Sequence, residues 1–164
     1  MEHYWTPSHK EKLNSSQTFD DLVDIALEIL EEMSKSNRPV VQLCGPISTG
    51  GVGTIKGNIE RFDHAIRVAH NKGMQVFSQT PFEKAMERIA PIYPMTDGYC
   101  LPILDIFYKK VFSSGHIKIA LFLPDWQSSY GATWERQLVS ELGIEIMEFP
   151  QEWFDQASND IMKP

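Results

Sequence analysis

Cysteine is scarce in this chain of 164 residues, which has only Cys44 and Cys100. Two cysteines are too few for a disulfide framework or a four-cysteine metal site. Cys44 ends an apolar run, and this position favours a small buried side chain over a reactive thiol. The sequence therefore predicts no disulfide and no metal centre.

Positive charge is also sparse, because 15 Lys and Arg residues stand against 22 Asp and Glu residues and the formal net charge is -7. Nucleic acids bind clustered Lys and Arg, and the only adjacent basic pair here is Lys109-Lys110. The composition argues against a nucleic-acid partner. A small anionic ligand remains compatible with it, because backbone N–H groups can bind phosphate without net positive charge.

Long apolar runs are absent as well. No run approaches the ~20 residues that a membrane-spanning helix needs. Residues 1–5 contain no basic segment followed by an apolar one, so they do not predict a signal peptide. We expect a cytoplasmic protein with no membrane partner.

An alternation of helical and strand patterns is what the sequence does have. Thr18 is typical of a helix N-cap, with Asp21 three residues later as its capping-box partner. Apolar residues at helical spacing follow as far as Met33. Val40 to Cys44 is a short apolar run that predicts a buried strand. Residues 1–15 are polar and lack periodicity, and they predict a loose arm.

The rest of the chain repeats this alternation. Further strands are expected at about 74–77, 117–123 and 144–147, and further helices at about 58–73, 80–89, 101–112, 132–142 and 150–162. Thr80, Pro81 and Glu83 favour a helix start, as N-cap, first residue and capping-box partner. The alternation predicts an α/β three-layer sandwich with a central parallel sheet of four to five strands, Rossmann- or flavodoxin-like. We expect residues 1–38 to be an N-terminal arm and helix, and residues 39–164 to be the α/β domain.

Two polar loops follow predicted strands of this sheet, where such folds bind ligands. The first, 45–54, is rich in glycine, which lets backbone amides turn toward a ligand, and Ser48 can add a hydroxyl donor. It contains neither a Gly-Lys-Ser/Thr sequence nor Gly-x-Gly-x-x-Gly spacing, so Walker and dinucleotide sites are not indicated. Phosphate or sugar binding is expected here, and a connection without a ligand is the alternative.

The second loop, 124–131, precedes a helix that carries Glu135, six residues after Ser129. We expect Glu135 in the first turn, where the helix dipole keeps a carboxylate ionised. An ionised carboxylate can attack an anomeric carbon or stabilise an oxocarbenium ion. The alternative is a glutamate that merely favours a helix N-terminus. Asp125 is either a general acid/base or a turn residue, and Trp126 could stack on a nucleobase.

A combination of short motifs connects these loops. The strand at 40–44 is followed by Gly45-Pro46-Ile47-Ser48, then by Asn58 and Phe62, and Gly73-Met74-Gln75-Val76-Phe77 precedes Pro81. The most specific block is Leu123-Pro124-Asp125-Trp126-x-x-Ser129-x-Gly131-Ala132-x-x-Glu135, followed by Leu142-Gly143-Ile144. Over about residues 39–149 the chain resembles the nucleoside 2-deoxyribosyltransferase superfamily, which includes nucleoside-5'-phosphate N-glycosidases and uncharacterised bacterial and phage relatives.

The resemblance implies cleavage of the N-glycosidic bond of a nucleoside or nucleotide, with Glu135 as the nucleophile. Ser129 stands where the nucleotide hydrolases have a phosphate-binding serine, so a 5'-phosphate is expected near Ser129 and Ser48. The implied catalytic residues are Glu135 and Asp125, and the implied substrate-binding residues are Gly45, Pro46, Ile47, Ser48, Asn58, Trp126, Ser129 and Gly131. No metal or organic cofactor is implied, and a homodimer or larger homo-oligomer is expected.

The sequence departs from this superfamily at several positions. Gln42 stands where the transferases have a tyrosine, and Lys118 stands about where many relatives have an aspartate. A sugar-binding carboxylate could then come from Asp97 or Asp105. Trp134, directly before Glu135, could narrow the pocket.

Two other interpretations remain open. One is a non-catalytic nucleotide-binding or sensor module on the same fold, which the missing carboxylate near Lys118 favours. The other takes 50–54 as the phosphate loop of lysine-decarboxylase-like phosphoribohydrolases. Their motif has a glutamate three residues after the threonine, where this chain has Gly57.

Overall fold

The computed structural model describes residues 4–155 of the chain. Its helices are α1 (Pro7–Ser15), α2 (Phe19–Ser34), α3 (Ile55–Asn71), α4 (Glu83–Ile89), α5 (Lys109–Ser113) and α6 (Tyr130–Glu141), and its strands are β1 (Val40–Cys44), β2 (Gln75–Val76), β3 (Ile117–Phe122) and β4 (Glu145–Glu148). The strands form one parallel sheet in the order β2-β1-β3-β4. The predicted α/β sandwich with a central parallel sheet is confirmed.

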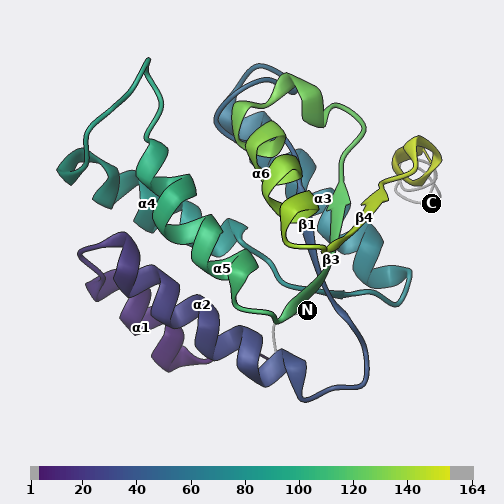
Figure 1. Ribbon diagram of the computed structural model, residues 1–164, viewed down its shortest axis with the longest axis horizontal. Coiled ribbons are helices and arrows are strands. Elements are labelled where there is room, and N and C mark those ends of the chain that lie inside the picture. The colour runs from purple at the N-terminus through teal and green to yellow at the C-terminus, as the bar shows by residue number, and fades with distance from the viewer. Residues whose placement is uncertain (1–3, 156–164) are drawn as a thin grey trace, which may run out of the picture.

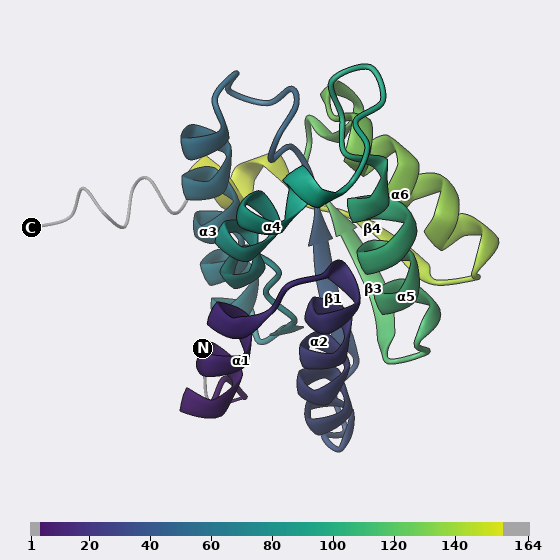
Figure 2. The same cartoon turned by 90° about the vertical axis from the view of Figure 1, so that its left-hand side faces the viewer.

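The strand order creates a switch point between β1 and β3. From β1 the chain passes out to β2 on one side, then returns across β1 to β3 and on to β4. Because the strands are parallel, the carboxyl ends of β1 and β3 lie together, and loops that leave them diverge there. Figure 2 shows both arrowheads pointing to the end of the molecule where the loops 45–54 and 93–100 lie.

Helices cover both faces of the sheet and create two cores. On one face, Val40 and Cys44 of β1 pack in a core with α2, α4, α5 and α6. On the other face, Val41 and Leu43 pack against α3 and the residues that follow β4. In Figure 1, α1, α2, α4 and α5 lie to the left of the strands, and the C-terminal segment lies to the right. All five residues of β1 are buried, as expected for a central parallel strand.

Helix α2 forms as its sequence predicts. The Thr18 hydroxyl accepts a hydrogen bond from the Asp21 amide at 3.2 Å, and the Asp21 carboxylate accepts one from the Thr18 amide at 3.1 Å. This capping box satisfies two N–H groups that a helix N-terminus leaves without partners. The helix buries its apolar face, including Leu22 and Met33, against the sheet.

The N-terminal segment is more ordered than its sequence suggests. The expected loose arm over residues 1–15 is wrong for 7–15, which form α1 with Thr6 as N-cap and Pro7 in the first turn. Leu13 is buried, and the Arg88 guanidinium donates to the carbonyls of Leu13 and Ser16 at 2.9 and 2.7 Å. One apolar residue and a distant arginine produce no sequence periodicity, which is why the helix was not predicted.

Two helix starts also differ from the prediction. Helix α3 begins at Ile55 rather than near residue 58, because the Thr54 hydroxyl caps the Gly57 amide. Thr80 does not cap α4; it lies in a 3₁₀ turn (Thr80–Phe82) and donates to the Asp63 carboxylate at 2.7 Å. A partner 17 residues away along the chain outcompetes the local cap.

The predicted helix over 101–112 is present, but its middle is wider than an α-helix. Residues Ile103–Tyr108 adopt a π-helix that continues into α5. Of the predicted terminal helix over 150–162, residues 151–155 are helical, and 156–162 lie outside the described residues. None of the helices within residues 4–155 has the length and apolar character to cross a membrane.

Candidate functional site

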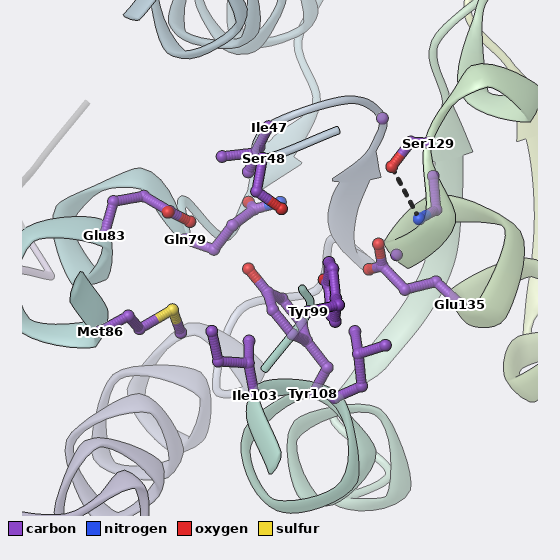
Figure 3. Close-up of a pocket in the computed structure, with 14 residues that line it drawn as sticks. Ile47, Ser48, Gln79, Glu83, Met86, Tyr99, Ile103, Tyr108, Ser129 and Glu135 are labelled. Atoms are coloured by element: carbon purple, nitrogen blue, oxygen red, sulfur yellow. Dashed lines mark hydrogen bonds between the residues drawn. The ribbon is translucent and has the colours of Figure 1, made fainter. Parts of the chain in front are cut away.

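A cavity of about 70 Å³ lies at the carboxyl ends of β1 and β3. Its walls come from the loop after β1, the start of α6, the segment after β2 and the π-helix, as Figure 3 shows. The lining residues are Gly45, Ile47, Ser48, Gln79, Glu83, Met86, Tyr99, Ile103, Leu104, Tyr108, Ser129, Gly131, Ala132 and Glu135. The cavity therefore lies at the switch point of the sheet, where ligands bind in this class of fold.

The two loops beside the cavity are fastened to each other. The Gly51 amide donates to the Ser128 hydroxyl at 2.9 Å, and the Tyr130 amide donates to the Thr49 hydroxyl at 2.9 Å. Gly50 has φ +68°, and a Cβ there would lie 2.1 Å from the Ser128 carbonyl oxygen. Only glycine allows this approach, so the two loops form one rigid wall.

Asn58, at the start of α3, organises the first loop from behind. Its amide nitrogen donates to the carbonyls of Ile47 and Gly50 at 3.0 and 3.1 Å, and its carbonyl oxygen accepts from the Val52 amide at 2.9 Å. The side chain is buried and does not line the cavity. Asn58 thus supports the loop.

Three backbone amides of the first loop are occupied by acceptors within the protein. Those of Gly51, Val52 and Gly53 donate to Ser128, Asn58 and Gly50 within the protein. The expected phosphate cradle therefore does not form from these three amides. Hydroxyl groups, including those of Ser48 and Ser129, remain as polar groups of the two loops at the cavity wall.

Glu135 lies at the cavity in a different state from the one expected. It is the sixth residue of α6 rather than part of the first turn, and it is only 6% exposed. The helix dipole acts mainly within the first turn, whereas burial disfavours a carboxylate everywhere in a dry site. Burial raises the pKa of Glu135 from 4.5 to about 8, so the expectation of an ionised carboxylate is wrong.

The surroundings of Glu135 leave one of its two carboxyl oxygens without a hydrogen-bond partner within the described residues. A hydrogen bond with the Cys44 thiol lowers the pKa of Glu135, the nearby charge of Glu83 raises it, and burial outweighs both. Oε2 is buried and has no hydrogen-bond partner within the described part of the chain. Among residues 4–155, Glu135 forms no salt bridge. A buried carboxyl oxygen without a hydrogen-bond partner is unusual. Glu135, which has this oxygen, is one of the residues that line the cavity.

Glu83, at the start of α4, is a second carboxyl group in the cavity. Burial and the neighbouring charge of Glu87 raise the pKa of Glu83 to about 7. Figure 3 shows Glu83 and Glu135 approaching from opposite sides, with Tyr99 and Tyr108 between them. Two carboxyl groups with raised pKa values in one cavity are a common basis of acid/base chemistry.

The two tyrosines reach the cavity from different elements. Burial raises the pKa of both the Tyr99 and the Tyr108 phenol, so both remain protonated donors. Tyr99 hydrogen-bonds to Ser48, and a Cβ on Gly131 would lie 3.0 Å from its hydroxyl oxygen. Tyr108 is placed by the π-helix, a distortion often found at functional sites.

The structure brings together six of the ten residues that the sequence singled out. Gly45, Ile47, Ser48, Ser129, Gly131 and Glu135 line the cavity, whereas Pro46, Asn58, Asp125 and Trp126 do not. Asp125 forms a salt bridge with Arg61 at 2.8 Å. The Trp126 ring lies 4.5 Å from the Arg136 guanidinium, and Tyr130 packs against Tyr99.

The structure also shows where the residues lie at which the sequence differs from the nucleoside 2-deoxyribosyltransferase pattern. Asp97 and Asp105 are exposed and do not line the cavity, so neither supplies a carboxylate there; Glu83 does. Trp134 lies beside Asp105 at a separate surface depression and does not narrow the cavity. Gln42 is fully buried, and neither atom of its amide has a hydrogen-bond partner among residues 4–155.

Sequence reasoning missed Gln79, Glu83 and Tyr108, and it considered Tyr99 only as an aromatic residue that could stack on a nucleobase. Gln79 and Glu83 follow β2, which pairs with β1, so the order of the strands brings them to the same edge. The sequence did contain a signal for Gln79 and Glu83, because the predicted strand that became β2 also ends at this edge of the sheet. Nothing in the sequence indicated that a π-helix would turn Tyr108 inward.

Within the described residues, no group of three or more His, Cys, Asp or Glu side chains is arranged to hold a metal ion. Comparisons of the chain with protein-family models, with curated proteins and with solved structures each find no match.

Proposed function

We propose that the protein cleaves the N-glycosidic bond of a nucleoside 5'-phosphate, with Glu135 as the nucleophile. One observation carries this proposal: a buried carboxyl group with an unpartnered oxygen lines a cavity at the switch point of the sheet. The resemblance of residues 39–149 to nucleoside 2-deoxyribosyltransferases and nucleotide N-glycosidases supports the same chemistry.

The proposed reaction has two steps. A carboxylate oxygen of Glu135 attacks C1' of the sugar while the bond to the base breaks, and a glycosyl ester forms. Water or a second base then releases the sugar from Glu135. Hydrolysis and transfer share the first step, and the protein needs neither a metal nor an organic cofactor for it.

The start of α6 offers a binding site for the sugar phosphate. Ser129 Oγ accepts a hydrogen bond from the Ala132 amide at 3.1 Å, which leaves its hydroxyl proton for another acceptor. Gly131 presents no side chain to the cavity, and α6 is long enough for its dipole to favour an anion. Ser48 faces Ser129 from the first loop, as Figure 3 shows.

The raised pKa of Glu135 has a direct consequence for turnover. With a pKa of about 8, only roughly one molecule in ten has the attacking carboxylate at pH 7. A buried carboxylate is poorly solvated, so the small ionised fraction is a strong nucleophile. The attacking form of Glu135 should therefore become more abundant as the pH rises toward 8.

The proposal is tested by measuring base release from a panel of ribo- and deoxyribonucleoside monophosphates. Glu135→Gln should lower the rate at least ~100-fold, because an amide cannot form the ester intermediate. Glu141→Gln is a matched control, since Glu141 is exposed on the same helix. Full activity of Glu135→Gln would refute the role of Glu135.

A nucleotide-binding or sensor module is the second candidate. The carboxyl group of Glu135, with a pKa of about 8, is mostly neutral at pH 7, and a neutral carboxyl group is a poor nucleophile. Equal binding of a nucleotide by wild type and Glu135→Gln, with base release by neither, would favour this function over catalysis.

A further inference from the structure

An apolar groove of about 590 Å³ runs between α3 and α4 beside the cavity. Its walls are mainly aliphatic and include Ile55, Ile59, Met86, Ala90 and Ile103. A groove of this size falls within the range that small-molecule ligands occupy. Ile55 is 56% exposed, so its side chain is accessible to a ligand in the groove.

The groove and the cavity are continuous. Five residues line both: Ile47, Ser48, Glu83, Met86 and Ile103. The cavity of about 70 Å³ is too small to enclose a nucleotide, so any nucleotide that reaches Glu135 must place its remaining part elsewhere. The adjoining groove is the space into which it extends.

Glu83 stands at the junction of the two spaces. It is the one ionisable residue among the five shared ones. A sugar carbon held at Glu135 and a base held in the groove would put the bond between them at this junction. An anionic nucleobase is a poor leaving group, so an acid must protonate the base as the bond breaks. That acid is needed at the junction of the cavity and the groove.

We infer that the groove between α3 and α4 binds the leaving base, and that Glu83 is the general acid that protonates it. This inference rests on the proposed function of Glu135. Aliphatic walls suit the flat, weakly polar faces of a base, and the junction gives Glu83 access to its edge.

The step balances in atoms and charge. Glu135 forms an ester bond to C1', the electron pair of the C1'–N bond goes to the base nitrogen, and the carboxylic acid of Glu83 gives that nitrogen a proton. The base leaves neutral, and Glu83 becomes a carboxylate. In the second step the oxygen of water bonds to C1', the ester bond breaks with its electron pair going to the Glu135 carboxylate, and Glu83 takes the proton from the water and returns to its acid form.

The charges around Glu83 favour an acid that works near neutral pH. Glu87 and Lys84 flank it on α4, Lys56 and Glu60 line the groove from α3, and Tyr99, Tyr108 and Glu135 face it across the cavity. Burial and the Glu87 carboxylate raise the pKa of Glu83 to about 7, so about half of the molecules have the proton at pH 7.

A leaving-group comparison tests the role of Glu83. The first substrate is 2'-deoxyguanosine 5'-monophosphate, whose base needs a proton to leave. The second is its 7-methylated form, whose base already has a positive charge and departs neutral without one. Glu83→Gln should slow release from the first substrate at least ~100-fold and from the second less than ~5-fold. Activity on the methylated substrate also shows that the variant is folded.

The outcomes separate the two proposals. Equal losses on both substrates, or no loss on either, would overturn the acid role of Glu83 while the role of Glu135 stands. A large loss in Glu135→Gln on both substrates is expected, since the nucleophile is needed whichever base leaves. Absence of base release by wild type would overturn the proposed function and this inference together.

A pair of isoleucine variants tests the groove itself. Ile55→Glu places a charge in the groove, and Ile92→Glu is the matched control because Ile92 is 63% exposed and lines neither space. The Kd of free guanine, measured by equilibrium dialysis, should rise about tenfold or more in Ile55→Glu and stay unchanged in Ile92→Glu. Equal affinity of Ile55→Glu and wild type would overturn the assignment of the groove.

Discussion

At Glu135, two local effects act on one carboxyl group in opposite directions. Burial disfavours the ionised form, while the hydrogen bond with the Cys44 thiol favours it. Burial is the larger effect, because a thiol is a weak donor and a carboxylate in a dry site loses most of its solvation. Burial, then the charge of Glu135 and the same hydrogen bond, raise the pKa of the Cys44 thiol, which keeps it a protonated donor.

The first prediction follows from this balance. Cys44→Ala removes the donor, so the pKa of Glu135 should rise further above 8. For the 7-methylated substrate, whose base leaves without an acid, the ascending limb of the pH profile of kcat/KM should then move to higher pH. A weak hydrogen bond corresponds to a shift of about half a pH unit. The measurement is base release between pH 5.5 and 9.5.

Cys100→Ala is the control for this shift. Cys100 is also buried, at 6% exposed, but it does not line the cavity. Its substitution should leave the ascending limb where it is. A shift of the same size in both variants would mean that general loosening of the core, and not the contact between Cys44 and Glu135, sets the pH profile.

At the level of elements, the wall of the cavity depends on close contact between the first loop and Ser128, at the end of the 3₁₀ turn Trp126–Ser128. Gly50→Ala would impose strain at φ +68° and overlap with the Ser128 carbonyl. Gly53→Ala imposes strain at φ +90° alone, since nothing lies within 4 Å of a Cβ there. We expect Gly53→Ala to destabilise by roughly 1–2 kcal/mol and Gly50→Ala by a further ~1–3 kcal/mol.

Urea denaturation of the two glycine variants checks this prediction. The difference between them isolates the contact between the loops from backbone strain. Gly50→Ala should also lower base release at temperatures where it is folded, because Ser48 and Ser129 would move apart. Similar stability of the two variants would show that the loops do not pack as the structure has them.

Elements whose signals are local were predictable from the sequence. Thr18 and Asp21 cap α2 within one turn, and the apolar run from Val40 to Cys44 forms the central strand. The prediction errors occur where a partner distant in sequence determines the local structure. Arg88 hydrogen-bonds to the Ser16 carbonyl at the end of α1, and Asp63 accepts a hydrogen bond from the Thr80 hydroxyl. Single-sequence patterns contain no information on such pairs.

The candidate site was predicted to a similar extent. Both loops were located correctly, because parallel strands bring their carboxyl ends to one edge. The ionisation state of Glu135 was not predicted, since burial depends on the residues that cover it, and Tyr108 comes from a π-helix that has no sequence signal. Its nucleophilic role remains a prediction.

At the scale of the whole molecule, the two carboxyl groups of the cavity, buried Glu135 and partly buried Glu83, link folding to pH. Glu83 and Glu135 have pKa values raised to about 7 and about 8 in the folded protein, against 4.5 for an ordinary glutamate. The pKa values of Asp21 and Glu28 are lowered by hydrogen bonds, but both groups lie at the surface, where solvent weakens such effects. Glu83 and Glu135 should therefore dominate the pH dependence of the free energy of unfolding.

The sign of the effect follows from proton binding. Between pH 4.5 and about 8 the folded protein keeps a proton on Glu135 that the unfolded chain has released, so the folded state binds more protons. The contribution of Glu135 to the free energy of unfolding is fully present below pH 4.5, and it is lost as the pH rises through about 8. The free energy of unfolding should fall across this range, by an amount on the order of a few kcal/mol for Glu135.

Glu135→Gln tests this linkage, because glutamine has the same shape and never ionises. Wild type and variant should have similar stability at pH 5, and the variant should become the more stable one by pH 8.5, since it escapes the cost of burying a charge. Urea denaturation at pH 5, 6, 7, 8 and 8.5 measures the difference. Curves that stay parallel would mean that Glu135 ionises freely in the folded protein and is solvated, which contradicts its burial at 6% exposure. The cost that makes this carboxylate unfavourable in the folded protein is the same one that makes it reactive, so loss of the pH dependence and loss of base release should occur together in this variant.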